Sequence, residues 1–289
     1  TSVLYYDCTN YFFEISSSSG LRQFGIGKDH KPNPLVQMGL FMDAGGVPLA
    51  FSIHPGNTNE QTTLRPLEEK ILKDFKCSRF IVCTDAGLSS TDNRRYNTEG
   101  DRAFVTVQSV KKLKQYLKEW ALSPDGWRLP DSEQLYCLSD LDEEKDKEKI
   151  FYKERWINEN NLEQRLIVSY SLKYKDYKES VREGHIERAM KAIGRGEKGS
   201  KKVNPNDFRR FIASVKYTDD GELAERTKLY LDKERIKNEQ EYDGFYAVCT
   251  NLEGDAKEII RINKNRWQIE SCFKVLKGEF KSRPVNLQK

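Results

Sequence analysis

Two aspartates follow short apolar segments, at positions where a folded chain places ligands. Asp7 comes after segment 3–6, and Asp85 comes after segment 79–84. Both segments are typical of buried strands, and open α/β sheets hold ligand-binding groups at the carboxyl ends of their strands. If the strands are neighbours, the two carboxylates can converge, and carboxylate oxygens suit Mg²⁺ or Mn²⁺. Aspartate also ends strands for turn geometry alone, so position by itself assigns no role.

A third carboxylate, Glu270, lies within segment 255–280, which has helical periodicity. At about 100° per residue, Glu270 shares a polar stripe with Asn263, Arg266 and Lys277. An apolar stripe beside it predicts the buried face: Ile262, Ile269, Phe273, Leu276 and Phe280. Glu270 then lies at the rim of the buried face, able to lean toward a sheet. The alternative is a solvated i, i+4 ion pair between Arg266 and Glu270.

The elements that must position these residues begin with an α/β lobe over residues 1–108. Segment 3–6 is expected to be a strand, and segment 35–51 a β-hairpin that turns at Gly45 and Gly46. A helix is expected within 59–75, followed by strands at 79–84 and 103–107. Alternating strands and helices of this kind indicate an α/β fold.

Residues 109–243 differ in character and are interpreted as an inserted lobe, mainly β with one charged helix. Charge-rich stretches cover 140–149 and 191–202, segment 165–170 is strand-like, and segment 174–193 is helix-like. The basic residues of that helix are expected to form a solvated face. Residues 244–289 return to the first lobe, with a strand at 245–250 and the helix that carries Glu270.

Composition sets limits on function without choosing one. Charged residues make up 33% of the chain, and the formal net charge of +4 permits nucleic-acid binding but does not diagnose it. No apolar run approaches the ~20 residues that span a bilayer, so no membrane partner is expected. The six cysteines contain no C-x-x-C pair and the three histidines are far apart. We expect free thiols, a reducing cytoplasmic setting and no zinc site. The start only six residues before Asp7 suggests a fragment of a longer protein.

Three segments resemble the catalytic segments of DDE transposases of bacterial insertion sequences: YYDCT (5–9), VCTDAG (82–87) and RWQIESCFKVLK (266–277). The branch they resemble carries a β-rich insertion before the glutamate and a Y-x2-R-x3-E-x6-K motif. Arg266, Glu270 and Lys277 match that motif, whereas Asn263 replaces its tyrosine. The resemblance extends to loop 25–33 and to segment 56–60.

This resemblance implies a ribonuclease H-like, retroviral integrase-like catalytic core with an inserted lobe. Asp7 would bridge two Mg²⁺ ions, which Mn²⁺ can replace, and Asp85 and Glu270 would each complete one ion site. The function implied is cleavage at transposon ends and strand transfer into target DNA, with double-stranded DNA and a second copy of the chain in a synaptic homodimer as partners. DNA contacts are expected from Arg266, Lys277, Asn263, Lys28 and Lys31. Candidates to hold a flipped base are Trp120, Trp127, Trp156, Tyr242 and Phe245.

Two alternatives stay open. One is a ribonuclease H-like nuclease that cuts without joining, and the other is a transposase-derived DNA-binding protein without chemistry. The basic loop 25–31 and the stretch 191–202 offer phosphate contacts but no recognisable base-reading helix. DNA binding by this chain is therefore expected to be weak, salt-sensitive and poorly selective.

Overall fold

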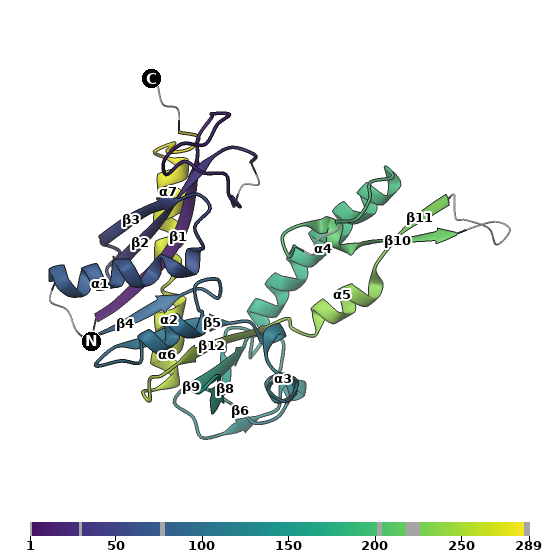
Figure 1. Ribbon diagram of the computed structural model, residues 1–289. Helices are drawn as coiled ribbons and strands as arrows, with labels where there is room; N and C mark the ends of the chain where they lie inside the picture. Colours follow the sequence, from purple (N-terminus) through teal and green to yellow (C-terminus); the bar gives the residue numbers. More distant parts are fainter. Residues whose placement is uncertain (1, 29–30, 76–78, 201–203, 218–225, 286–289) are drawn as a thin grey trace. The chain divides into compact units, whose positions relative to one another are not determined.

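The computed structural model describes residues 2–28, 31–75, 79–200, 204–217 and 226–285 (Figure 1). The fold is mixed α/β and contains a large mixed sheet. The chain forms two compact units: unit 1 comprises residues 1–109, 154–167 and 247–289, and unit 2 comprises residues 110–153 and 168–246. Segment 154–167, which the sequence analysis assigns to the inserted lobe, therefore belongs to unit 1.

The large sheet has ten strands in the described chain, and their order begins β3-β2-β1-β4-β5-β12-β9-β8, with two short strands beyond β8. Strands β1, β4 and β5 run parallel, while β2, β3 and β12 pair antiparallel with their neighbours β1, β2 and β5. The bounds are β1 (Ser2–Phe12), β2 (Leu35–Asp43), β3 (Pro48–Pro55), β4 (Phe80–Thr84), β5 (Ala103–Gln108), β8 (Phe151–Glu159), β9 (Leu162–Tyr170) and β12 (Phe245–Thr250).

The predicted hairpin between β2 and β3 is confirmed. Gly46 has a φ of 84°, a conformation that glycine adopts without steric cost. The Asp43 carboxylate accepts hydrogen bonds from the amides of Gly45 (2.9 Å) and Val47 (2.8 Å) and so closes the turn.

Strand β1 is longer than the sequence predicts. It runs to Phe12 because it pairs with β2 along nearly its whole length, from Leu4 opposite Asp43 to Phe12 opposite Leu35. Asp7 therefore lies in the middle of a strand, and the expectation that it ends one is wrong. Asp85 does follow β4 directly, as predicted.

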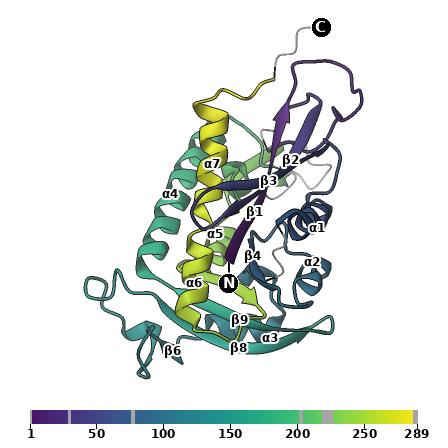
Figure 2. The ribbon, with the colours of Figure 1, turned by 90° about the vertical axis from the view of Figure 1, so that its left-hand side faces the viewer.

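Helices cover both faces of this sheet (Figure 2). The pair α1 (Leu64–Phe75) and α2 (Thr91–Tyr96) lies on one face, and α6 (Ala256–Lys264) and α7 (Trp267–Gly278) lie on the other. Alternation along β1 divides its side chains between them. Tyr6 and Cys8 pack in a core with Leu64 and Leu67 of α1, whereas the Tyr5 hydroxyl donates to the Ile262 carbonyl of α6 (3.0 Å).

The prediction of one continuous helix over 255–280 is wrong. The backbone amides of Arg266, Gln268 and Ile269 bond to the carbonyls three residues earlier, which interrupts the i to i+4 ladder between α6 and α7. Burial of Ile262, Ile269 and Phe273 is confirmed. Phe280 lies beyond the end of α7 and is 72% exposed, so its expected place in the core is wrong.

Unit 2 is richer in helix than the predicted mainly β lobe. Its helices are α3 (Gln115–Leu122), α4 (Leu172–Gly194, 23 residues) and α5 (Lys233–Gln240). Its strands include β6 (Trp127–Arg128), β7 (Leu135–Tyr136) and the hairpin of β10 (Ile212–Tyr217) and β11 (Arg226–Leu231). The expected charged helix is α4. It also holds two buried basic residues, His185 and an Arg182 that pairs with the buried Asp243, so its basic residues do not all form a solvated face.

Five cysteines of the described chain are free thiols, as expected, while Cys77 and His30 lie outside the described residues. No helix in the described part of the chain has the length and apolar character needed to span a membrane.

Candidate active site

Asp7 and Asp85 lie at the same level of the sheet. Strand β1 pairs with β4 so that each residue lies opposite the one 78 positions later, from Ser2 opposite Phe80 to Tyr5 opposite Cys83. Asp7 is two residues beyond Tyr5, and Asp85 is two residues beyond Cys83. Because side chains alternate along a strand, this register directs both carboxylates to the face that also carries α6 and α7.

Asp7 is a buried carboxyl group, with 8% of its surface exposed. Burial raises its pKa to about 6, and the negative charge of Asp85 adds to the increase. The positive charges of Lys28 and Arg266 oppose it, as does the hydrogen bond that the Cys8 amide donates to Asp7 Oδ1 (2.7 Å). Asp7 therefore has two cations and a second carboxylate within electrostatic reach.

Lys28 is fixed beside Asp7, since its Nζ donates to the Cys8 carbonyl at 2.5 Å. The resemblance to DDE transposases predicts that Lys28 contacts DNA. In the structure, the positive charge of Lys28 partly offsets the negative charge of the buried Asp7 carboxylate. Lys31, the other predicted contact of this loop, is exposed.

Asp85 is held by the turn that follows it. Its Oδ1 accepts hydrogen bonds from the amides of Gly87 (2.9 Å) and Leu88 (3.0 Å), and the Thr106 hydroxyl donates to its carbonyl (3.3 Å). Aspartate favours such turns because its short side chain reaches the amides two and three residues later.

Glu270 is paired with Arg266, whose Nη2 lies 2.6 Å from Glu270 Oε1. The Glu270 side chain is 53% exposed and that of Arg266 is 18% exposed. The i, i+4 ion pair that the sequence left open is therefore present. Among the described residues, no three acidic, histidine or cysteine side chains gather as metal ligands. The structure brings together Asp7, Asp85 and Arg266, and Arg266 holds Glu270.

The donor chemistry of the Asp7–Asp85 pair fits a hard divalent cation. Both offer carboxylate oxygens, the ligand type that Mg²⁺ and Mn²⁺ prefer. A cation bound between them would also relieve the repulsion and burial that raise the pKa of Asp7. Glu270 could add a third carboxylate if it released Arg266.

Asn263, which the resemblance assigns to DNA, is a buried residue of α6. It is 8% exposed, and its Oδ1 has no hydrogen-bond partner among the described residues. The break between α6 and α7 separates it from the polar face of Glu270, which is why its expected alignment with that face is wrong. Lys277 is partly exposed on α7, and its Nζ lies 5.8 Å from the centre of the Phe273 ring.

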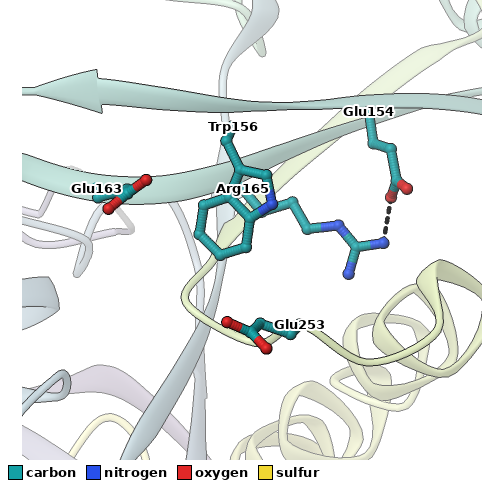
Figure 3. Close-up of a pocket in the computed structure, with 5 residues that line it drawn as sticks. All are labelled: Glu154, Trp156, Glu163, Arg165 and Glu253. Atoms are coloured by element: carbon teal, nitrogen blue, oxygen red, sulfur yellow. Dashed lines mark hydrogen bonds and ion pairs between the residues drawn. The ribbon is translucent and has the colours of Figure 1, made fainter.

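Among the aromatic candidates for a flipped base, Trp127 is buried, Trp156 is exposed, and the other three are partly buried: Trp120, Tyr242 and Phe245. Trp127 is fully buried and packs against Tyr170 and Phe245, with ring centres 6.0 and 5.8 Å away. Trp156 is 44% exposed beside a cavity of about 560 Å³ (Figure 3). The other residues that line this cavity are Glu154, Glu163, Arg165 and Glu253. Because Arg165 pairs with Glu154, the lining is acidic and disfavours a DNA backbone there.

Sequence reasoning missed the residues that hold the turn after Asp85. Gln61 Nε2 donates to the Gly87 carbonyl (3.1 Å), and Asn93 Nδ2 donates to the Leu88 carbonyl (2.9 Å). One signal could have found Asn93: Ser90 is a typical N-cap, and its side chain accepts from the Asn93 amide. A helix whose N-cap comes five residues after Asp85 must place its first turn close to that aspartate.

The sheet defines a mixed α/β domain in which Asp7 lies on β1 and Asp85 directly follows the adjacent parallel strand β4. The chain belongs to the Transposase DDE domain family, which its sequence matches over residues 23–289. The match includes Asp85 and Glu270 and begins after Asp7. The family consists of catalytic transposases, which generally use divalent metal ions.

Comparison with solved structures finds a similar chain in a cryo-EM structure of a piggyBac transposase synaptic complex with hairpin DNA. Sequence identity is 8% and the TM-score is 0.44. The similarity covers 96% of this chain and 40% of that one, so this chain spans less than half the length of that transposase. A comparison with curated proteins finds no match.

Proposed function

We propose that this chain is the catalytic portion of a DNA transposase that cleaves transposon ends and transfers them into target DNA. In this proposal unit 1 is a ribonuclease H-like core, and unit 2 is a lobe inserted between Asp85 and Glu270. Membership of the DDE family supports the reaction class. The observation that carries the assignment is the equivalent placement of Asp7 and Asp85 on adjacent parallel strands.

Asp7, Asp85 and Glu270 would hold the divalent ions, Mg²⁺ or Mn²⁺. Such ions lower the pKa of the attacking water or hydroxyl and stabilise charge on the attacking and leaving oxygens. Asp7 must be ionised for this role, and the charges of Lys28 and Arg266 favour its ionised form. The turn at Gly87 and Leu88 holds the Asp85 carboxylate in place.

Arg266 connects the metal site to DNA in this proposal. A DNA phosphate can replace the half-exposed Glu270 carboxylate as the partner of its guanidinium, because Arg forms two parallel hydrogen bonds with phosphate as it does with carboxylate. When Arg266 turns to a DNA phosphate, Glu270 is released from the pair seen here and becomes able to serve as a ligand. Lys277, on the same helix, is positioned for a second phosphate.

The test is cleavage of DNA that carries the sequences flanking the gene, in the presence of Mg²⁺. Asp7→Asn, Asp85→Asn and Glu270→Gln preserve side-chain size, and each is expected to lower cleavage at least about 100-fold by removing a ligand. Glu258→Gln is the matched control, because Glu258 forms an equivalent ion pair with Arg261 at 2.6 Å on α6. Near-normal cleavage by any of the three well-folded variants would remove that residue from the site.

A second experiment separates transposase from nuclease. With pre-cut ends and Mg²⁺, a transposase produces DNA molecules that are joined to the target, whereas a nuclease of the same architecture produces only cut DNA. Chemical crosslinking of the chain on those ends tests for the proposed homodimer. If a metal titration shows no binding, the chain is a DNA-binding derivative without chemistry.

A further inference from the structure

The short turn after Asp85 is held by side chains at every carbonyl. Four residues, 86–89, join Asp85 to Ser90, the N-cap of α2, and each of their carbonyl oxygens accepts a hydrogen bond from a side chain. The donors are Ser89 Oγ to Ala86 (3.1 Å), Gln61 Nε2 to Gly87 (3.1 Å), Asn93 Nδ2 to Leu88 (2.9 Å) and Arg94 Nε to Ser89 (3.2 Å). Loops seldom carry so complete a set of side-chain contacts, since water usually satisfies their carbonyls.

Arg94 extends this turn to the sheet. Besides the Ser89 carbonyl, its guanidinium donates to Ser89 Oγ (3.2 Å), to Gln108 Oε1 (2.9 Å) and to Gln164 Oε1 (2.9 Å). Gln108 is the last residue of β5, and Gln164 lies in β9 with only 2% of its surface exposed. One rigid group therefore fixes the turn to two strands of unit 1.

Within the described part of the chain, Arg94 donates to four neutral oxygens and contacts the Cys249 thiol, and it forms no ion pair with an acid. The planar guanidinium presents its donors in a fixed fork, which a lysine or a glutamine cannot reproduce. Its geometry accounts for its presence here better than its charge does.

The turn and the Asp85 carboxylate form one unit. Asp85 Oδ1 accepts from the amides of Gly87 and Leu88, so the orientation of those amides sets the orientation of the carboxylate. A shift of Ser89 would move the amides and, with them, the carboxylate that faces Asp7.

We propose that Arg94 is the positioning residue for Asp85: it fixes the turn 86–89 to β5 and β9 and thereby sets the carboxylate for metal binding. The proposal rests on the proposed function, which makes Asp85 a ligand. Arg94 itself contacts neither metal nor DNA in this scheme.

Replacing the Arg94 guanidinium is expected to change the affinity for Mg²⁺ more than the rate of DNA cleavage at saturating Mg²⁺. In Arg94→Met and Arg94→Lys, the Mg²⁺ concentration for half-maximal cleavage should rise about 10-fold or more, as is usual when a residue that orients a ligand is lost. Cleavage at saturating Mg²⁺ should return to within a few-fold of the wild type, and DNA binding without metal should not change. Hydrogen exchange of the backbone amides in 86–89 should accelerate at least about 10-fold.

Arg95→Met is the matched control. Arg95 is the next residue of α2, and it donates to the Asn160 carbonyl (3.0 Å) and lies 3.6 Å from Asp92 without touching the turn. Its loss should leave the Mg²⁺ dependence and the exchange of 86–89 as in the wild type. Gln164→Met removes one acceptor and keeps Arg94, so it should shift both readouts in the same direction by a smaller factor.

Hydrogen exchange separates failure of this proposal from failure of the proposed function. If residues 86–89 of folded Arg94→Lys or Gln164→Met exchange as slowly as those of Arg95→Met, Arg94 does not position the turn and the proposal is overturned. Faster exchange together with an unchanged Mg²⁺ dependence would also overturn it, because the turn would then not govern metal binding. If the wild-type chain neither binds metal nor cleaves DNA, the proposed function fails, and faster exchange would still establish the contact between Arg94 and the turn.

Discussion

Arg266 lies between the first and the third of the proposed catalytic carboxylates. Its Nη2 is 2.6 Å from Glu270 Oε1, and its charge also lowers the pKa of Asp7, which burial raises. The Arg266 side chain is 18% exposed, whereas that of Glu270 is 53% exposed, so the cation is the more buried partner. A group placed in this way can pair with a carboxylate in the free protein and with a phosphate in a complex.

Replacing Arg266 is expected to weaken DNA binding and to make it less dependent on salt. Arg266→Ala removes one phosphate contact, so the slope of log affinity against log salt should become shallower by about 0.9. Binding to duplex DNA at several salt concentrations measures this slope. The control is Arg261→Ala, which removes a cation of α6 that is 69% exposed. An unchanged slope in Arg266→Ala would leave Arg266 with a role in pairing with Glu270 alone.

Lys28 is expected to set the acid limit of metal-dependent activity. The pKa of Asp7 is about 6, and its ionised form is needed as a ligand, so Mg²⁺-dependent cleavage should fall as the pH drops through this value. Lys28 lowers this pKa, and Lys28→Met should therefore move the acid limb to higher pH. Lys31→Met, a change at an exposed position of the same loop, is the control. Identical acid limbs in the wild type and Lys28→Met would contradict this assignment.

Glu68 is a fully buried carboxyl group of α1, with its Oε2 accepting from Asn97 Nδ2 at 3.2 Å. Burial raises its pKa from 4.5 to about 7, against opposing effects of Asn97 and of two arginines. A raised carboxyl pKa means that the folded chain holds this proton more tightly than the unfolded chain. Its contribution to stability is therefore greatest below pH 4.5 and is lost as the pH rises to about 7.

Glu68→Gln is expected to stabilise the chain at pH 8 by about 1–3 kcal/mol, since a neutral amide replaces a buried charge. The Glu68 Oε1 and Asn97 Oδ1 atoms have no hydrogen-bond partners among the described residues, and the new amide at position 68 can donate to Asn97 Oδ1. Urea unfolding between pH 5 and 8 measures the effect. The difference between variant and wild type should shrink toward pH 5, and two parallel stability curves would refute the role of Glu68.

Gly39→Ala is expected to destabilise unit 1 by about 1–3 kcal/mol through overpacking. Gly39 lies opposite Cys8 in the β1–β2 pair, and a Cβ atom there would come within 2.2 Å of the Tyr6 hydroxyl oxygen. Tyr6 is fully buried and bonded to Thr63 (2.7 Å), so it has little room to move. Thermal unfolding measures the change, with Gly254→Ala, where a Cβ has open space, as the control. Equal melting temperatures for these two variants would contradict the packing argument.

Patterns that depend on neighbouring residues were predictable from the sequence. The β2–β3 hairpin, the strand before Asp85 and β12 lie where hydrophobic runs and turn residues place them. The length of β1 was not predictable, because Asp7, Thr9 and Asn10 interrupt its apolar run and yet are buried between covering elements. Burial of that kind is decided by tertiary packing, which local hydrophobicity does not report.

In the candidate site, too, features set by neighbouring residues were predictable and features set by tertiary packing were not. The separation of 78 residues between the two aspartates equals the register offset of β1 and β4, but no sequence pattern specifies a strand register across so long an interval. From the sequence, Glu270 could be a metal ligand or the ion-pair partner of Arg266, and no sequence pattern decided between these two roles. Periodicity also failed at Asn265, where a change to i to i+3 hydrogen bonds separates two helices that share one apolar pattern.

The pairing of Gln108 with Ala247 has a consequence for the length of the chain between them. Residues 109–246 lie between these two paired positions, and their segment 154–167 belongs to unit 1, so the core is left and rejoined by two segments, 110–153 and 168–246. The entropy of closing a flexible loop grows only with the logarithm of its length, at about 0.6 kcal/mol for each doubling. An insertion or deletion at a surface turn of 110–153 or 168–246 therefore costs the β5–β12 ladder little, and these segments can vary in size while Asp7 and Asp85 stay in register.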